Sequence, residues 1–131
     1  MWGNFQKLLD TIKVSLRLRT ERHHLLSANI ANVDTPGYRR KDIPFEKVME
    51  RYLQRERLLK TSSSRHIPLR DSRLSDLVRV YQPDTLGTPN NVSLEEEMTA
   101  LMENQLLYES TLQALAKELE RLREIITEGG K

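Results

Sequence analysis

The stretch LEEEMTALMENQLLYESTLQALAKELERLREIITE, residues 94–128, decides the fold of this 131-residue chain. Its apolar residues recur at alternating spacings of four and three, which is the a/d heptad register of a coiled-coil helix. Charged side chains fill the outer positions, so the pattern predicts one amphipathic helix from about residue 94 to 127. We expect this helix to pair through a seam of ten residues: Leu94, Met98, Leu101, Gln105, Tyr108, Leu112, Leu115, Leu119, Leu122 and Ile126.

Both ends of the predicted helix carry their own signals. Ser93 is a typical N-cap residue, and Glu96 three positions later completes a capping box. Three successive glutamates, residues 95–97, lie at the positive end of the helix dipole, and the basic residues of the helix lie nearer its negative end. The pair Gly129-Gly130 is expected to end the helix.

A second helical pattern runs from about residue 4 to 32. One face repeats at spacings of three or four and is mostly apolar: Phe5, Leu8 or Leu9, Ile12, Leu16, Arg19, His23, Leu26 and Ile30. Neither helix can bury its stripe alone, so we expect the two stripes to bury each other. The predicted fold is all-α, with two long terminal helices that pair as a coiled-coil-like hairpin around an irregular, partly mobile middle segment.

The chain therefore divides into three parts. Residues 1–36 hold the N-terminal helix and the motif that closes it, residues 37–91 form a variable middle region, and residues 92–131 form the C-terminal heptad helix. Within the middle, Pro44 and the apolar residues after it predict a short helix over 45–59. Residues 77–81 predict a short strand, and the Ser- and Pro-containing stretch 60–91 predicts an extended or mobile chain.

Composition narrows the classes of function. The chain has no Cys, which excludes disulfides, zinc–thiolate clusters and a cysteine nucleophile. Its mean hydropathy is −0.61 and no stretch approaches about 20 apolar residues, so we expect no membrane insertion. The first twenty residues lack an apolar signal core, so we expect export, if it occurs, without an ordinary cleaved signal peptide.

The sequence offers no constellation for catalysis or metal binding. His23 and His24 are adjacent, and adjacent helical residues point about 100° apart, so the pair cannot share a metal ion as an i,i+4 pair can. The remaining histidine, His66, stands alone, and no glycine-rich phosphate loop is present. We therefore expect no catalytic residue, no metal site and no cofactor.

Charge is distributed unevenly along the chain. Residues 37–80 carry twelve basic and six acidic groups, whereas residues 81–131 carry four basic and ten acidic groups. The two parts could pair within one chain or between neighbours. A nucleic-acid-binding protein could also use the basic run Arg39-Arg40-Lys41, but the acidic third of so small a chain would weaken its affinity for phosphate. We therefore expect no nucleic-acid partner.

The most informative stretch is SANIANVDTPGYR, residues 27–39. The amides Asn29 and Asn32 are three residues apart on one face of the helix, beside small residues that allow close backbone approach. Pro36-Gly37 suits the centre of a type II turn that ends the helix. The two amides can serve as capping groups, or they can serve tight packing among several helices, and the sequence leaves both interpretations open.

This stretch resembles the signature of the flagellar rod, hook and hook-associated axial proteins, in which S-x-N-I/L-A-N closes the first helix and T-P-G-Y follows. The form with Asp34 before Thr35 resembles the short proximal-rod subunits, and Met102–Tyr108 is similar to the E-N-x-L-x-Y helix of one such subunit. The resemblance implies an assembly motif of nine residues: Ser27, Asn29, Ile30, Asn32, Asp34, Thr35, Pro36, Gly37 and Tyr38.

The resemblance also implies a function. It implies a structural subunit of the bacterial flagellar basal-body rod, located in the periplasm, that transmits motor torque. The implied partners are copies of the chain, FlgC-type and further rod proteins, the rod-base adaptor FliE and the flagellar type III export gate. Two alternatives remain: a generic coiled-coil adaptor, for which the heptads alone would suffice, and a helical nucleic-acid-binding protein.

Overall fold

The computed structural model describes residues 2–58, 79–80 and 92–130 of the chain. Three helices dominate it: α1 (Trp2–Ala31), α2 (Phe45–Leu58) and α4 (Leu94–Gly129). Two strands of two residues each, β1 (Lys41–Asp42) and β2 (Arg79–Val80), pair antiparallel, with Lys41 opposite Val80. The predicted all-α class is thus confirmed. Of the predicted strand over 77–81, residues 79–80 form β2, and the rest of 60–91 lies outside the described residues.

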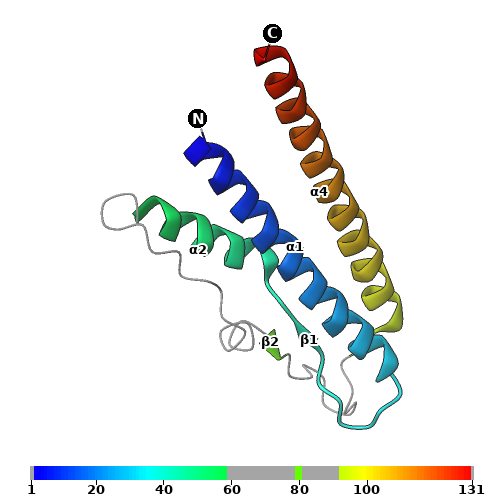
Figure 1. Cartoon of the computed structure of the whole chain (residues 1–131). Helices are drawn as coiled ribbons and strands as arrows, with labels where there is room; N and C mark the ends of the chain where they lie inside the picture. The colour runs from blue at the N-terminus through cyan, green and yellow to red at the C-terminus, as the bar shows by residue number, and fades with distance from the viewer. Residues whose placement is uncertain (1, 59–78, 81–91, 131) are drawn as a thin grey trace.

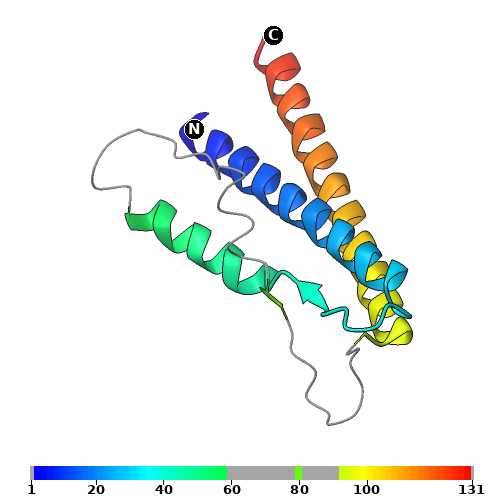
Figure 2. The same ribbon diagram turned by 90° about the horizontal axis from the view of Figure 1, so that it is seen from below.

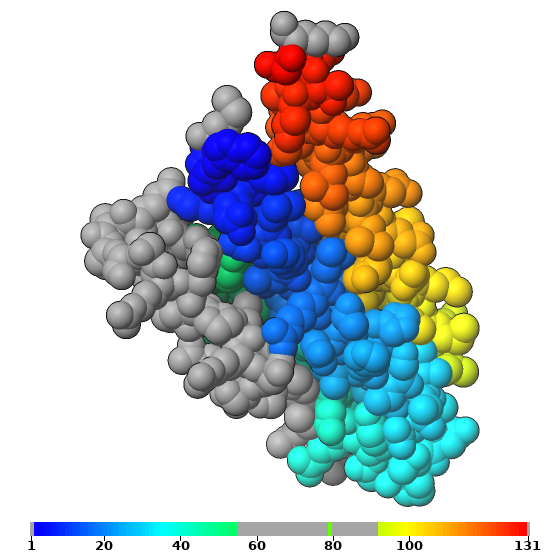
Figure 3. All heavy atoms as spheres, in the orientation of Figure 1, coloured from blue at the N-terminus to red at the C-terminus, as the bar shows by residue number. Residues whose placement is uncertain are grey.

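The two terminal helices lie side by side and run in opposite directions (Figure 1). Helix α2 packs on the other side of α1, as the view from below also shows (Figure 2). In the space-filling view α1 is flanked along one side by α4 (Figure 3). The predicted hairpin is therefore present, and α1 is its shared element, because it contacts both other helices.

The observed helix ends agree with the predicted ones to within two residues. The C-terminal helix begins at Leu94 as predicted, with Ser93 as N-cap, and the Ser93 hydroxyl accepts a hydrogen bond from the Glu96 backbone N–H at 3.4 Å. It ends at Gly129 rather than 127, and the Gly130 backbone N–H donates to the Glu128 carbonyl. Such small differences are usual at helix ends, where the last turn frays.

Beside the predicted pairing of the terminal helices, a cluster of buried apolar residues lies between α1 and the segment 43–49, which the sequence did not predict. Leu18, Ile43 and Val48 are buried there, and partly buried neighbours pack against them: Val14, Leu25, Phe45 and Met49. Val14, Leu18 and Leu25 are spaced four and seven residues apart, so they form a second helical stripe on α1. The stripe was visible in the sequence, but its partner, the segment 43–49, was not assigned to it.

None of the helices within the described residues combines the length and the apolarity that crossing a membrane requires.

We expect Leu18→Ala to lower the free energy of unfolding by about 3 kcal/mol, because it removes a fully buried side chain and leaves a cavity. Leu119→Ala, on the exposed side of α4, is the matched control and should lower it by less than about 1 kcal/mol. Urea denaturation of the two purified variants measures both values. Equal losses of unfolding free energy in the two variants would contradict the assignment of Leu18 to the core and of Leu119 to the exposed side of α4.

Candidate functional site

The motif predicted from the sequence ends α1 and reverses the chain. The Ala28 carbonyl accepts hydrogen bonds from the Asn32 backbone N–H at 3.1 Å and from Asn32 Nδ2 at 2.8 Å. The Thr35 hydroxyl donates to Asn32 Oδ1 at 3.1 Å. Asn32 therefore acts locally, because its side chain satisfies a carbonyl of the last helical turn and holds the turn that follows.

The predicted turn at Pro36-Gly37 is present. The Tyr38 backbone N–H donates to the Thr35 carbonyl at 3.2 Å, and Gly37 has φ +76°, as the third residue of a type II turn requires. The reversed chain then runs back beside α1 as residues 38–43, which include β1. The turn thus brings Tyr38 and Lys41 next to the helix that precedes them.

Asn29 is the centre of the site. Its side chain is fully buried, and its Nδ2 donates to the Lys41 carbonyl at 2.7 Å and to Glu97 Oε2 at 2.8 Å. Its Oδ1 accepts hydrogen bonds from the Tyr38 hydroxyl and from the Lys41 backbone N–H, each at 3.1 Å. A carboxamide offers two donors and two acceptor lone pairs, so all four are used. One side chain thereby joins α1, the chain after the turn, and α4.

A chain of charged side chains extends from Asn29 across the same region. Glu97 is fully buried, and its Oε1 accepts a hydrogen bond from Arg40 Nε. Arg40 Nη2 lies 3.7 Å from Asp42 Oδ2, and Arg22 binds Asp42 with both Nε (2.8 Å) and Nη2 (3.1 Å). The two cations balance the two anions, which is the condition under which buried charges are tolerated.

The electrostatic environment supports this arrangement. Burial, and then the nearby charge of Glu97, raise the pKa of the Tyr38 hydroxyl, so Tyr38 stays protonated and donates to Asn29 at neutral pH. The hydrogen bond to Asp42 raises the pKa of Arg22. Arg40 belongs to the basic run that a nucleic-acid-binding protein would use, and here its guanidinium contacts the carboxylates of Glu97 and Asp42.

A second polar contact joins α1 to α4 two turns further along. Asn104 is buried, and its Nδ2 donates to the Arg19 carbonyl at 2.9 Å. The guanidinium carbon of Arg19 lies 3.9 Å from the centre of the Phe45 ring, in a cation–π contact with α2. The fully buried residues of α4 are therefore both polar, Glu97 and Asn104, seven positions apart. In the sequence, the helix dipole alone accounts for Glu97, and no local pattern predicts either contact.

The predicted seam residues divide into two rows along α4. One row is half-buried beside α1: Leu101, Tyr108, Leu115 and Leu122. The other row, which we call the outward row, is exposed: Met98, Gln105, Leu112, Leu119 and Ile126. Leu94, at the start of α4, is also exposed. Within the chain, α1 therefore covers one of the two heptad rows.

The other motif residues lie nearer the surface. Ser27, Asp34, Thr35 and Pro36 are exposed, and Ile30 is half-buried. His23 is half-buried in a pocket between α1 and α4, and His24 is exposed. His66 lies outside the described residues. Across the ranges 2–58, 79–80 and 92–130, no group of three or more histidine, aspartate or glutamate side chains is placed to hold a metal ion.

Comparison with known proteins identifies relatives over almost the whole chain. A family model described as flagella basal body rod protein matches residues 25–39, the motif itself. The chain is 35% identical to the flagellar basal body rod protein FlgB of Salmonella typhimurium and 33% identical to that of Escherichia coli, each match covering 93% of this chain and 99% of the relative. It is 29% identical to FlgB of Bacillus subtilis, over 97% of this chain and 98% of the relative.

We expect Asn29→Asp to lower the free energy of unfolding by about 3 kcal/mol, because it replaces the two donors of Nδ2 with an oxygen that faces Glu97 and the Lys41 carbonyl. The same substitution at Asn32 is the matched control and should cost about 1 kcal/mol, since its amide acts on the local helix end. Thermal unfolding at neutral pH measures both. Similar losses would mean that Asn29 is also a local cap.

Gly37→Ala should lower the free energy of unfolding by about 1 kcal/mol through the backbone alone. Gly37 has φ +76°, and an added Cβ would meet no atom within 4 Å, so steric overlap adds nothing. Gly3→Ala, in α1 and equally uncrowded, should leave stability unchanged or raise it by a few tenths of a kcal/mol. Chemical denaturation compares the two, and a stabilising Gly37→Ala would contradict the assigned turn.

Proposed function

Because the chain belongs to the family of the flagellar basal body rod protein FlgB, it is a structural subunit of the flagellar basal-body rod, and we propose that it assembles there through its terminal helices. Membership of this family implies association with other components of the rod. The observation that carries the proposal is the outward row of α4, which α1 leaves uncovered.

The outward row supports assembly because a coiled-coil helix buries both of its heptad rows when its partners are in place. Leu112 and Leu119 are 40% and 48% exposed in the single chain. Burying such a side chain completely stabilises a complex by about 1.5–3 kcal/mol relative to leaving it exposed. Helices of neighbouring subunits are the natural partners of a row that runs the length of α4.

The hydrogen-bonded residues around Asn29 support the proposal in a second way, because they fix the geometry of the hairpin. Asn29, Glu97 and Arg40 tie the end of α1 to the first turns of α4, so they set how the hairpin presents the outward row to a neighbour. Buried hydrogen-bonded groups resist sliding of one helix along another, because any displacement leaves them unpaired. A subunit that transmits torque benefits from such a fixed geometry.

The family resemblance supports three finer parts of the proposal. The neighbours in the rod would include FlgC-type subunits and further rod proteins, and the adaptor FliE would meet the chain at the base of the rod. The chain would reach this place in the periplasm through the flagellar export gate, without a cleaved signal peptide. The subunit would have no catalytic activity.

We expect Leu112→Asp to reduce incorporation into rods at least tenfold while leaving the purified chain folded, because residue 112 lies in the outward row. Leu115→Asp, in the row beside α1, should instead lower the free energy of unfolding by about 3 kcal/mol, because it places a charge against α1. Cells that lack the gene are complemented with each variant, and isolated basal bodies are assayed for the subunit.

The control is Gln113→Asp, which adds the same charge at an exposed position next to the outward row but outside it. It should restore rods and motility as the unmodified chain does. Normal rod incorporation of Leu112→Asp would contradict assembly through this row. Complete basal bodies in cells that lack the gene would contradict the rod function altogether.

A further inference from the structure

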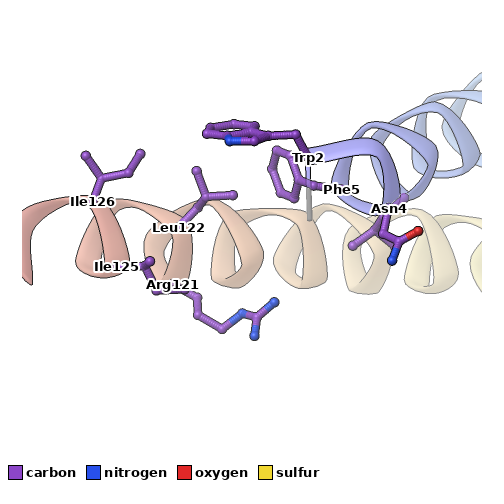
Figure 4. A pocket seen from close by; sticks show the side chains of 8 residues that line it. Trp2, Asn4, Phe5, Arg121, Leu122, Ile125 and Ile126 are labelled. Atoms are coloured by element: carbon purple, nitrogen blue, oxygen red, sulfur yellow. The ribbon is translucent and has the colours of Figure 1, made fainter. Parts of the chain in front are cut away.

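The hairpin exposes apolar side chains at both of its ends, and the two surfaces differ in chemistry. At the free ends of α1 and α4, which diverge (Figure 1), a cleft of about 440 Å³ has a mostly apolar lining (Figure 4): Trp2, Phe5, Leu8, Leu122, Ile125 and Ile126. None of these six side chains contains sulfur. At the opposite end of the hairpin, the exposed apolar surface of α4 includes two methionines, Met98 and Met102.

The two methionines form the centre of one exposed stripe on α4. Its four large apolar residues are spaced four positions apart and so lie along one face of the helix: Leu94, Met98, Met102 and Leu106. The side chains of Met98 and Met102 are 45% and 67% exposed. Met98 also belongs to the outward row, and Met102 lies about one turn further along the same face. Small solutes therefore reach both thioethers in the single chain.

The remaining sulfur atoms of the chain are placed differently. The sequence has four methionines and no cysteine, so thioethers are its only sulfur groups. Met49 is half-buried and packs against the apolar cluster between α1 and the segment 43–49. Met1 lies outside the described residues. Because exposure governs how fast a thioether is oxidised, Met98 and Met102 should react before Met49, which is a reference within the same chain.

Oxidation of a thioether by a peroxide needs no further group from the protein. The sulfur lone pair attacks one oxygen of hydrogen peroxide, the O–O bond breaks, an S–O bond forms, and the other oxygen leaves as water with both protons. Sulfur is oxidised by two electrons, and the flexible apolar side chain becomes a polar sulfoxide. Methionine sulfoxide reductases reverse the step: two thiols are oxidised to a disulfide, and the sulfoxide oxygen leaves as water.

The sulfoxides change the outer surface of α4 and leave the hairpin intact. Met98 follows the fully buried Glu97, and adjacent helical residues point about 100° apart, so Met98 faces away from the contact between Glu97 and Asn29. Met102 is the more exposed of the two methionines. An added oxygen at either sulfur therefore meets solvent in the single chain, and it meets a neighbour only when this face of α4 is covered.

We propose that Met98 and Met102 form a reversible oxidation site for peroxides, and that their sulfoxides exclude the subunit from the rod. A polar sulfoxide in the outward row removes the apolar burial that the row offers to a neighbour, until a reductase restores the thioether. The effect on assembly rests on the proposed function. The selective oxidation does not, because it is a property of the single chain.

The first experiment treats the purified full-length chain with dilute hydrogen peroxide. Mass spectrometry of its peptides, with fragmentation to separate neighbouring sites, follows the sulfoxide at each methionine over time. We expect Met98 and Met102 to be oxidised at least fivefold faster than Met49, with Met102 the faster of the two. The urea midpoint of the chain oxidised at these two residues should equal that of the untreated chain. Equal rates at all three methionines, or unfolding of the oxidised chain, would overturn the site.

The second experiment measures assembly in cells that lack the gene. They are complemented with the unmodified chain, with a Met98→Gln, Met102→Gln variant whose carboxamides imitate the polarity of the sulfoxides, or with a Met98→Leu, Met102→Leu variant that stays apolar and cannot be oxidised. The subunit is quantified in basal bodies isolated with and without peroxide treatment. We expect the glutamine variant to incorporate at least fivefold less than the unmodified chain. The leucine variant should incorporate normally and keep its incorporation under peroxide.

The two experiments separate this inference from the proposed function. Normal incorporation of the glutamine variant, or an equal loss of the leucine variant and the unmodified chain under peroxide, would mean that oxidation at these residues does not control assembly. The rod function would stand in both cases. If the unmodified chain is absent from rods, the proposed function is wrong, and the selective oxidation measured on the purified chain is unaffected.

Discussion

The hydrogen bonds of one amide, Asn29, hold the described structure together. Its two donors and two acceptors meet Tyr38 and Lys41, which the turn at Gly37 brings beside α1, and Glu97 of α4. A buried amide with every group satisfied is stable, whereas a displaced one would lose bonds that water cannot replace. The position of α4 relative to α1 therefore depends on this contact as well as on the heptad row that lies beside α1.

The two sides of α1 are packed by different kinds of buried residue. On the side of α2, Leu18, Ile43 and Val48 form a conventional apolar cluster that stabilises the single chain. On the side of α4 the fully buried partners are Glu97 and Asn104, while half of the heptad leucines point away from α1. The outward row of α4 is thus left for contacts outside the chain, whereas the buried polar groups and the half-buried row beside α1 hold the hairpin.

The sequence predicted the elements well because their signals are local. Heptad spacing, the Ser93 cap and the Pro36-Gly37 turn each depend on residues within a few positions, and all three are present. The pairing of Glu97 with Asn29 and Arg40 joins residues 57 to 68 positions apart. No local pattern specifies such a contact, and three successive glutamates at a helix start have a sufficient local explanation in the helix dipole. The seven-residue spacing of Glu97 and Asn104 is the sequence feature that could have indicated a polar row of α4 facing α1.

That spacing explains why the hairpin has one register. A heptad seam of leucines tolerates sliding by seven residues, about 10 Å along the helix, because each leucine meets another. The polar contacts do not tolerate it. A slide of one heptad would place Asn104 beside Asn29, where an amide could still accept a hydrogen bond, but it would separate Glu97 from Arg40. The loss of the contacts that Glu97 makes with Arg40 and Asn29 disfavours the shifted register, so the outward row is presented at one fixed height along the hairpin.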